Sequence, residues 1–124
     1  MDIVLYSRPQ SSYTAEDVAA LFDALDRSGM GWRVNRDFAS LAESLAGRSF
    51  APDELYDDAS QIDDRAQVMV SYGGDGTFLD CVRMLGGRPV PIIGINSGRL
   101  GFLANVSKRH LETAFRDLRK GNYS

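Results

Sequence analysis

A glycine-rich run directly behind a strand-like segment sets the strongest limit on how this chain can fold. The run, Gly73–Thr77, has the sequence GGDGT; it follows the apolar stretch 68–72 and precedes a helix-like segment, 78–85. A strand that turns at glycines and reopens as a helix directs backbone N–H groups, and the positive end of the helix dipole, at one point. Proteins commonly hold a phosphate group in this way. The run therefore predicts an α/β unit with a phosphate-binding turn.

Asp75 is the unusual residue of this turn, because a carboxylate repels an anionic ligand. Two roles would explain it: accepting a proton from an attacking hydroxyl, or holding a metal ion that bridges to phosphate. Both roles belong to phosphoryl transfer rather than to simple phosphate binding. The turn therefore indicates phosphoryl-transfer chemistry, with both roles open at this point.

Strand-like and helix-like patterns alternate along the whole chain. The strand-like segments are residues 3–6, 32–34, 68–72 and 91–95, and the helix-like segments are 14–29, 78–85 and 107–121. Thr14 and Asp17 form a helix-start signal, and Gly29 supplies the stop. This alternation predicts an open, mostly parallel, Rossmann-like sheet with helices on both faces.

Composition narrows the class of protein. The 124 residues amount to one domain, and 44% hydrophobic with 25% charged residues is typical of a globular protein. A net charge of −3 gives no electrostatic case for nucleic acid or an anionic membrane. The single cysteine, Cys81, excludes a disulfide within the chain, and the start has no signal-peptide pattern, so we expect a cytoplasmic location.

An acidic stretch at residues 50–64 carries six Asp and Glu side chains without Lys or Arg. It could form a metal site, but charge runs are usually solvated. We therefore expect a solvated loop or a short exposed helix there, and no protein metal site. His110, the only histidine, rules out a histidine-based triad within this chain, and one His with one Cys provides no zinc site.

A second glycine-rich loop, Gly94–Leu103 (GINSGRLGFL), follows the last strand-like segment. Because the carboxyl ends of parallel strands meet at one edge, this loop and Gly73–Thr77 should lie close together. Asn96 can donate and accept hydrogen bonds, and Phe102 could stack on a base or pack in the core. Neither loop fits the G-x-G-x-x-G or Walker A spacing, which disfavours a dehydrogenase or a P-loop enzyme.

Together, Gly73–Leu79 and Pro91–Leu103 resemble the N-terminal domain of the NAD kinases. The resemblance implies transfer of the γ-phosphoryl group of ATP, or of polyphosphate, to the 2′-hydroxyl of the adenosine ribose of NAD, which gives NADP. It also implies Mg²⁺ or another divalent cation bound with ATP.

The resemblance assigns Asp75 as the catalytic residue that accepts the hydroxyl proton. It further implies these nucleotide-binding residues: Gly73, Gly74, Gly76, Thr77, Leu79, Asn96 and Phe102. Asp80 departs from the pattern, because many members of the family have a basic residue there.

The family's chains continue into a second, β-rich domain, to which nothing in residues 1–124 corresponds. We therefore expect an N-terminal fragment that is inactive alone and belongs to a homo-oligomer at full length. Two alternatives remain open: a lipid kinase of the GGDGT type, and a non-catalytic nucleotide-binding module. Against the lipid kinases, Phe78-Leu79-Asp80 stands where those enzymes have an Asn-Glu pair.

Overall fold

Parallel strands form one sheet at the centre of the computed structural model, which describes residues 2–9, 13–62 and 66–96. Within these residues the sheet has five strands in the order β3-β2-β1-β4-β5, and each neighbouring pair is parallel. The strands are β1 (Asp2–Tyr6), β2 (Gly31–Asn35), β3 (Leu55–Tyr56), β4 (Ala66–Gly73) and β5 (Ile92–Asn96). The predicted α/β class and parallel sheet are confirmed.

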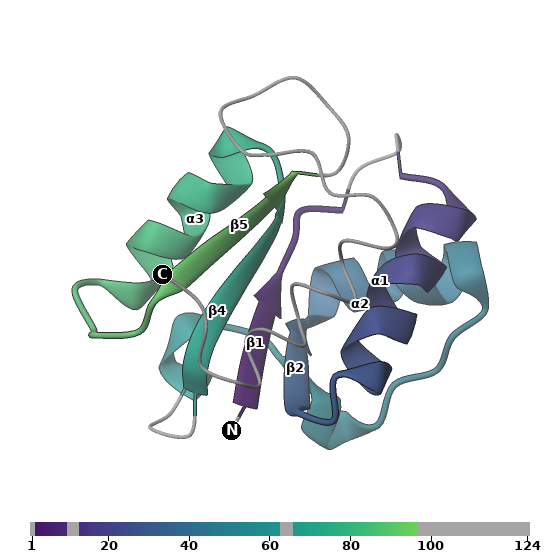
Figure 1. The fold of residues 1–124 in the computed structure, drawn as a ribbon, viewed down its shortest axis with the longest axis horizontal. Helices are drawn as coiled ribbons and strands as arrows, with labels where there is room; N and C mark the ends of the chain where they lie inside the picture. The colour runs from purple at the N-terminus through teal and green to yellow at the C-terminus, as the bar shows by residue number, and fades with distance from the viewer. Residues whose placement is uncertain (1, 10–12, 63–65, 97–124) are drawn as a thin grey trace.

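Helices cover both faces of this sheet, as predicted (Figure 1). Helices α1 (Ala15–Arg27) and α2 (Arg36–Ala46) pack on one face, and α3 (Asp75–Leu85) packs on the other. Two short 3₁₀ helices, η1 (Pro52–Glu54) and η2 (Ala59–Gln61), flank β3. In the described part of the chain, no helix is both long and apolar enough to cross a bilayer.

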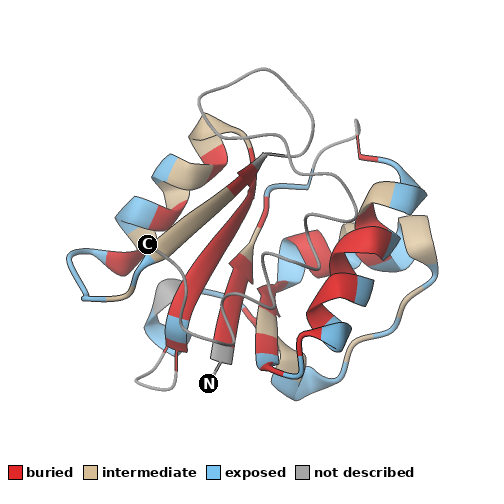
Figure 2. Ribbon diagram, in the orientation of Figure 1, coloured by how far each residue is buried: buried red, intermediate tan, exposed pale blue. Residues whose placement is uncertain are grey.

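Successive side chains along each strand point to opposite faces of the sheet, so the hydrophobic core is divided into one cluster on each face. Ile3 and Leu5 of β1 lie in the cluster with α1 and α2, whereas Val4 between them lies in the cluster with α3. This division is the period of two that a strand imposes on its side chains. Buried residues accordingly fill most of β1, β2 and β4 and the helix surfaces that face them, whereas β5 is mostly of intermediate burial (Figure 2).

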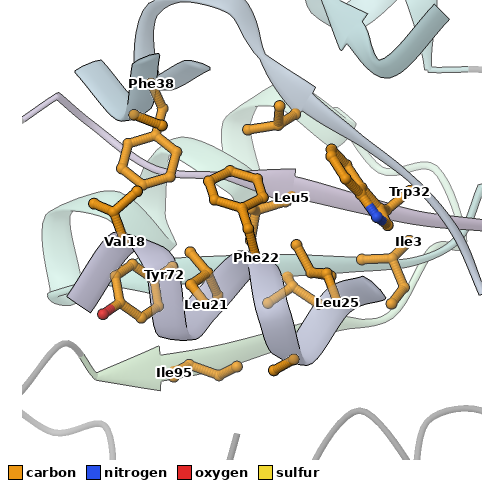
Figure 3. Packing of buried hydrophobic residues seen from close by; sticks show 14 of the residues in the cluster. Ile3, Leu5, Val18, Leu21, Phe22, Leu25, Trp32, Phe38, Tyr72 and Ile95 are labelled. Carbon is orange, nitrogen blue, oxygen red and sulfur yellow. The ribbon is translucent and has the colours of Figure 1, made fainter. Parts of the chain in front are cut away.

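Aromatic rings dominate the core on the α1 and α2 side. Phe22 of α1 lies between Phe38 and Trp32 (Figure 3), with ring centroids 6.0 and 5.4 Å away. Phe22 and Phe38 are fully buried, and burying such a side chain contributes roughly 1.5–3 kcal/mol. These rings therefore fix both helices against β1 and β2.

The direction in which the chain crosses the sheet reverses between β1 and β4. From β1 the chain moves outward through α1 to β2 and through α2 to β3; from β4 it moves the opposite way through α3 to β5. In open α/β sheets, ligands bind outside the carboxyl ends of the strands at such a reversal. The fold thus singles out the carboxyl ends of β1 and β4.

The strands and helices predicted within the described residues are confirmed, although their first and last residues differ from the predicted ones. Helix α1 begins with a capping box in which the Thr14 side chain accepts from the Asp17 N–H. Helix α3 begins at Asp75, three residues before the predicted start, so the last part of the GGDGT run is already helical. The predicted helix 107–121 lies outside the described residues.

Two elements, α2 and β3, were not predicted. The prediction of a solvated loop or exposed helix for 50–64 is wrong at Leu55–Tyr56, which form an edge strand with Tyr56 buried. Tyr56 donates its hydroxyl to the carbonyl of Leu5, 2.9 Å away, so this part of the acidic stretch is fastened to the sheet.

Candidate functional site

The turn between β4 and α3 requires glycine at its first position. Gly73 has φ +149°, a backbone conformation that other residues rarely adopt. A Cβ at this position would stand 2.7 Å from Oγ1 of Thr77 and 3.1 Å from the hydroxyl of Tyr13. Thr77 is itself buried, so its side chain packs against the turn. Gly73 thus lets β4 pass closely over the start of α3.

The amino end of α3 lies immediately beyond the carboxyl end of β4. Gly74 is the N-cap residue and Asp75 is the first helical residue; the first intrahelical bond runs from the Phe78 N–H to the Gly74 carbonyl at 3.1 Å. Glycine at the N-cap leaves space beside the N–H groups of the first turn, and a Cβ on Gly74 would have nothing within 4 Å. A turn that is open in this way, at a helix amino terminus, is suited to an anion.

Strand β5 brings the start of the second glycine-rich loop to the same place. In the parallel pairing of β4 with β5, Gly73 is opposite Asn96. The prediction that the two loops lie close together is confirmed at this point, where the second loop leaves its strand. The Asn96 side chain and all of residues 97–103, with Phe102, lie outside what the structure describes.

The carboxyl end of β1 is joined to β2 and β4 by a buried polar network. The Ser7 hydroxyl donates to the Tyr72 carbonyl at 2.7 Å and lies 3.1 Å from the Tyr13 hydroxyl. The Asn35 amide donates to the Ser7 carbonyl at 2.8 Å and accepts from the Ser7 N–H at 3.1 Å. A network of this kind, with its bonds satisfied in a buried setting, holds the ends of three strands in one arrangement.

Arg8 follows this network and reaches across the strand reversal to α3. Its Nε and Nη2 donate to the two carboxylate oxygens of Asp80, at 2.6 and 2.9 Å. Tyr6 also donates its hydroxyl to Asp80, at 2.9 Å. The guanidinium lies against Gly76: a Cβ there would stand 3.0 Å from Nη1 and 3.4 Å from Cζ. The missing side chain at Gly76 therefore lets Arg8 approach the turn.

The charges of this contact shift the pKa values of its members. The hydrogen bond from Arg8 lowers the pKa of the Asp80 carboxyl; the bond from Tyr6 acts in the same direction, and partial burial opposes both. Burial, and then the hydrogen bond to Asp80, raise the pKa of Tyr6 to about 12. Near neutral pH the contact therefore holds an ionised carboxylate, a neutral tyrosine and a charged guanidinium.

Sequence reasoning located the two glycine-rich loops but missed the loop after β1. Arg8 and Tyr13 carry no motif, yet one signal was available: both follow a predicted buried strand, and so lie at the edge of the sheet where the glycine-rich loops begin. Asp80, noted only as a departure from the family pattern, is the carboxylate that fixes Arg8.

Two large apolar side chains are exposed on α3. Leu79 is 52% exposed and Val82 is 47% exposed, whereas Cys81 between them is fully buried. Leu79 therefore presents an apolar surface close to the amino end of α3.

Among the described residues, no group of three or more His, Cys, Asp or Glu side chains could hold a metal ion. In the acidic stretch, Asp57 accepts from Arg36 at 2.6 Å, and the carboxylate of Asp58 accepts from the hydroxyl of Ser60. These acids are engaged in local contacts at the β2 and β3 side of the sheet, away from the GGDGT turn.

Comparison with known proteins now decides the family. Residues 8–123 match the model of the ATP-NAD kinase N-terminal domain. This chain belongs to the NAD kinase family. The resemblance inferred from the two loops is thereby confirmed, and it extends over nearly the whole chain.

Relatives named NAD kinase align with the chain from end to end. The NAD kinase of Bacteroides fragilis is 33% identical over 124 residues, which are 100% of this chain and 42% of that protein. The NAD kinase of Azoarcus sp. is 34% identical over 122 residues, 98% of this chain and 40% of that protein. The chain therefore spans less than half the length of these relatives.

A solved structure supports the fold independently. The structure of yeast NADH kinase in complex with NADH matches with a TM-score of 0.73 at 22% identity, covering 98% of this chain and 36% of that one. At this identity the match concerns the fold. It supports the α/β fold described above.

Proposed function

We propose that the protein to which this chain belongs is an NAD kinase, which transfers the terminal phosphoryl group of ATP or polyphosphate to the 2′-hydroxyl of the adenosine ribose of NAD. The observation that carries the proposal is the position of Asp75. It is the first residue of α3, directly beyond the carboxyl end of β4 and beside the reversal of strand order. Because the chain covers 42% of the Bacteroides fragilis relative, the activity is proposed for the full-length protein.

Asp75 would accept the proton of the attacking hydroxyl. Phosphoryl transfer has a loose transition state, so alignment of the hydroxyl matters more than a strong base. The Asp75 carboxylate would therefore serve by orienting the hydroxyl with its acceptor oxygens. Its place at the start of α3, within the GGDGT turn, would keep the hydroxyl next to the N–H groups that hold the phosphate.

The remaining predicted site residues would surround the dinucleotide and the phosphate. Gly73, Gly74 and Gly76 would bring the backbone close to the phosphate, and buried Thr77 would stabilise the turn. Exposed Leu79 would contact the dinucleotide. Asn96 and Phe102, from the second loop, would orient it and stack on its adenine.

A divalent cation fits the site as a companion of the phosphates. Mg²⁺ typically binds to substrate phosphates with one or two carboxylates, and Asp75 is a carboxylate that the turn offers. When bound, the ion would neutralise charge on the transferred group. The rest of the full-length chain would close the crevice, exclude water, and contribute to oligomer contacts in the cytoplasm.

The test compares Asp75→Asn with Asp37→Asn in the full-length protein. Asp37 is also an aspartate in the first turn of a helix, α2, that follows a parallel strand. That strand is β2, which does not lie at the reversal. We expect Asp75→Asn to lower kcat by about 10²–10⁴-fold and Asp37→Asn to leave it within about twofold. NADP formation would be measured with ATP and polyphosphate as donors, and with NAD and NADH as acceptors.

Each outcome has a defined meaning. Near-normal turnover by Asp75→Asn would remove Asp75 from catalysis. A wild-type protein that phosphorylates a lipid and leaves NAD unchanged would replace the proposal with the lipid-kinase alternative. Binding of NAD or ATP without any turnover would favour the non-catalytic module.

A further inference from the structure

We propose that Arg8 binds a phosphate group of the ligand in the crevice, with Asp80 and Tyr6 holding its guanidinium in place. The inference rests on the proposed function and adds a residue from the loop after β1, which none of the sequence motifs includes. The ligand chemistry is a phosphate chain, which both the phosphoryl donor and the dinucleotide present.

The position of Arg8 is the first argument. The strand order 3-2-1-4-5 reverses between β1 and β4, and ligands of open α/β sheets bind outside the carboxyl ends at that reversal. Arg8 lies two residues beyond the end of β1, and the GGDGT turn lies at the end of β4. Arg8 and Asp75 therefore follow the two neighbouring strands, β1 and β4, between which the strand order reverses.

The geometry of the guanidinium is the second argument. Its Nε and Nη2 edge is taken by the two oxygens of Asp80, so its Nη1 side faces the turn, 3.0 Å from where a Cβ on Gly76 would stand. Arginine carries five N–H donors in a rigid fork, so one edge can be anchored on a carboxylate while the other contacts a phosphate. The anchoring pair thus orients a cation toward the amino end of α3.

Exposure is the third argument. The Arg8 side chain is 47% exposed, whereas that of Asp80 is 18% exposed and also accepts from Tyr6. A surface ion pair usually contributes little to stability. Here Asp80, which is 72 residues away in the sequence, accepts two hydrogen bonds from Arg8 and a third from Tyr6. These contacts hold the half-exposed guanidinium beside an anion-binding turn. The side chain is fixed before the ligand arrives, which lowers the entropy cost of binding.

The test uses the full-length protein and three substitutions. Arg8→Gln removes the charge, Arg8→Lys keeps the charge but loses the fork, and Arg36→Gln is the matched control. Arg36 also follows a parallel strand and pairs with an aspartate through Nε at 2.6 Å, but it begins α2 after β2, away from the reversal. KM for ATP, KM for NAD, kcat and the thermal midpoint would be measured for each.

We expect Arg8→Gln to raise one KM by about 10- to 100-fold, the loss typical of a charged hydrogen bond. Arg8→Lys should lie between Arg8→Gln and the wild type, and Arg36→Gln should stay within about twofold of the wild type. A rise confined to ATP assigns the contact to the donor, and a rise confined to NAD assigns it to the dinucleotide; both support the proposal.

The proposal is overturned if neither KM changes more than twofold, or if Arg36→Gln gives the same change. It is also overturned if both KM values rise together with a fall in kcat and in thermal midpoint, because a structural role would do that. Calorimetric titration with ATP and with NAD keeps the test separate from the proposed function. If the wild type binds nucleotide without turnover, the kinase proposal fails while the effect of Arg8→Gln on binding can still be measured.

Discussion

Replacing Gly73 with alanine tests whether the turn between β4 and α3 depends on its first glycine. The new Cβ would stand 2.7 Å from Oγ1 of Thr77 and 3.1 Å from the Tyr13 hydroxyl, both closer than van der Waals contact allows. Such overpacking costs roughly 1–3 kcal/mol. The backbone angle, φ +149°, adds strain of about 1–3 kcal/mol for a residue with a side chain. We therefore expect Gly73→Ala to destabilise the docking of α3 on β4 by about 2–6 kcal/mol.

The buried thiol of Cys81 reports this docking directly. Cys81 is fully buried on the inner face of α3, and burial raises its pKa to about 12, so the docked thiol is unreactive. When reclosing is faster than labelling, the rate of thiol modification follows the opening equilibrium. A destabilisation of about 2–6 kcal/mol corresponds to an increase in labelling rate of roughly 30- to 20,000-fold. The full-length protein would be labelled, and the peptide that contains Cys81 quantified by mass spectrometry.

Gly74→Ala is the matched control, because it makes the same chemical change one residue later. Gly74 has φ −109°, and a Cβ there would have nothing within 4 Å. Alanine is a poorer N-cap than glycine, so a cost below about 1 kcal/mol is expected. Equal labelling rates for the two variants would refute the reasoning, since they would show that neither the close contact nor the backbone angle matters.

Three further outcomes follow from other contacts. Tyr13→Phe removes a hydroxyl that donates to the Tyr72 carbonyl at 3.3 Å, and should lower the free energy of unfolding by about 0.5–1.5 kcal/mol in urea denaturation. Gly47→Ala places a side chain at φ +66° with nothing within 4 Å, so conformational strain alone should cost about 1–2 kcal/mol in the same assay. Because Arg8 lowers the pKa of Asp80, this carboxylate should stabilise the fold above its ordinary pKa, and the contribution should be lost as pH falls through the lowered pKa. Asp80→Asn should therefore reduce the fall in the free energy of unfolding on the acid side of its pH profile. An unchanged fall would contradict the stabilising role of the contact between Arg8 and Asp80.

Local signals in the sequence predicted much of the fold. The GGDGT run marks both the end of β4 and the start of α3, because glycines and a helix-start pattern act within a few residues. The capping box of α1 is equally local, since Thr14 and Asp17 are three residues apart. Apolar runs predicted β1 and β5 because buried parallel strands require them.

Helix α2 had a weaker local signal that the sequence reasoning did not use. Phe38, Leu41, Ala42 and Leu45 recur at helical spacing, and Gly47 follows the last turn in a left-handed conformation. Its N-cap residue, Asn35, does not cap the helix with its side chain, which instead joins the backbone of Ser7. The Asn35 side chain, which could have capped α2, therefore joins the ends of β2 and β1 instead.

The sequence by itself thus determined the glycine-rich turn, the α/β class and the family, because each depends on residues that are neighbours along the chain or on a short motif. Tertiary structure alone decided the order of the strands, the two-residue strand β3 and the contact of Arg8 with Asp80. Strand β3 is too short for any periodicity and exists because Leu55 and Tyr56 pair with Val34 and Asn35 of β2. Arg8 and Asp80 are 72 residues apart and meet because β1 and β4 are adjacent in the sheet. Such pairings are stabilised by burial over the whole sheet, and no local run of residues encodes them.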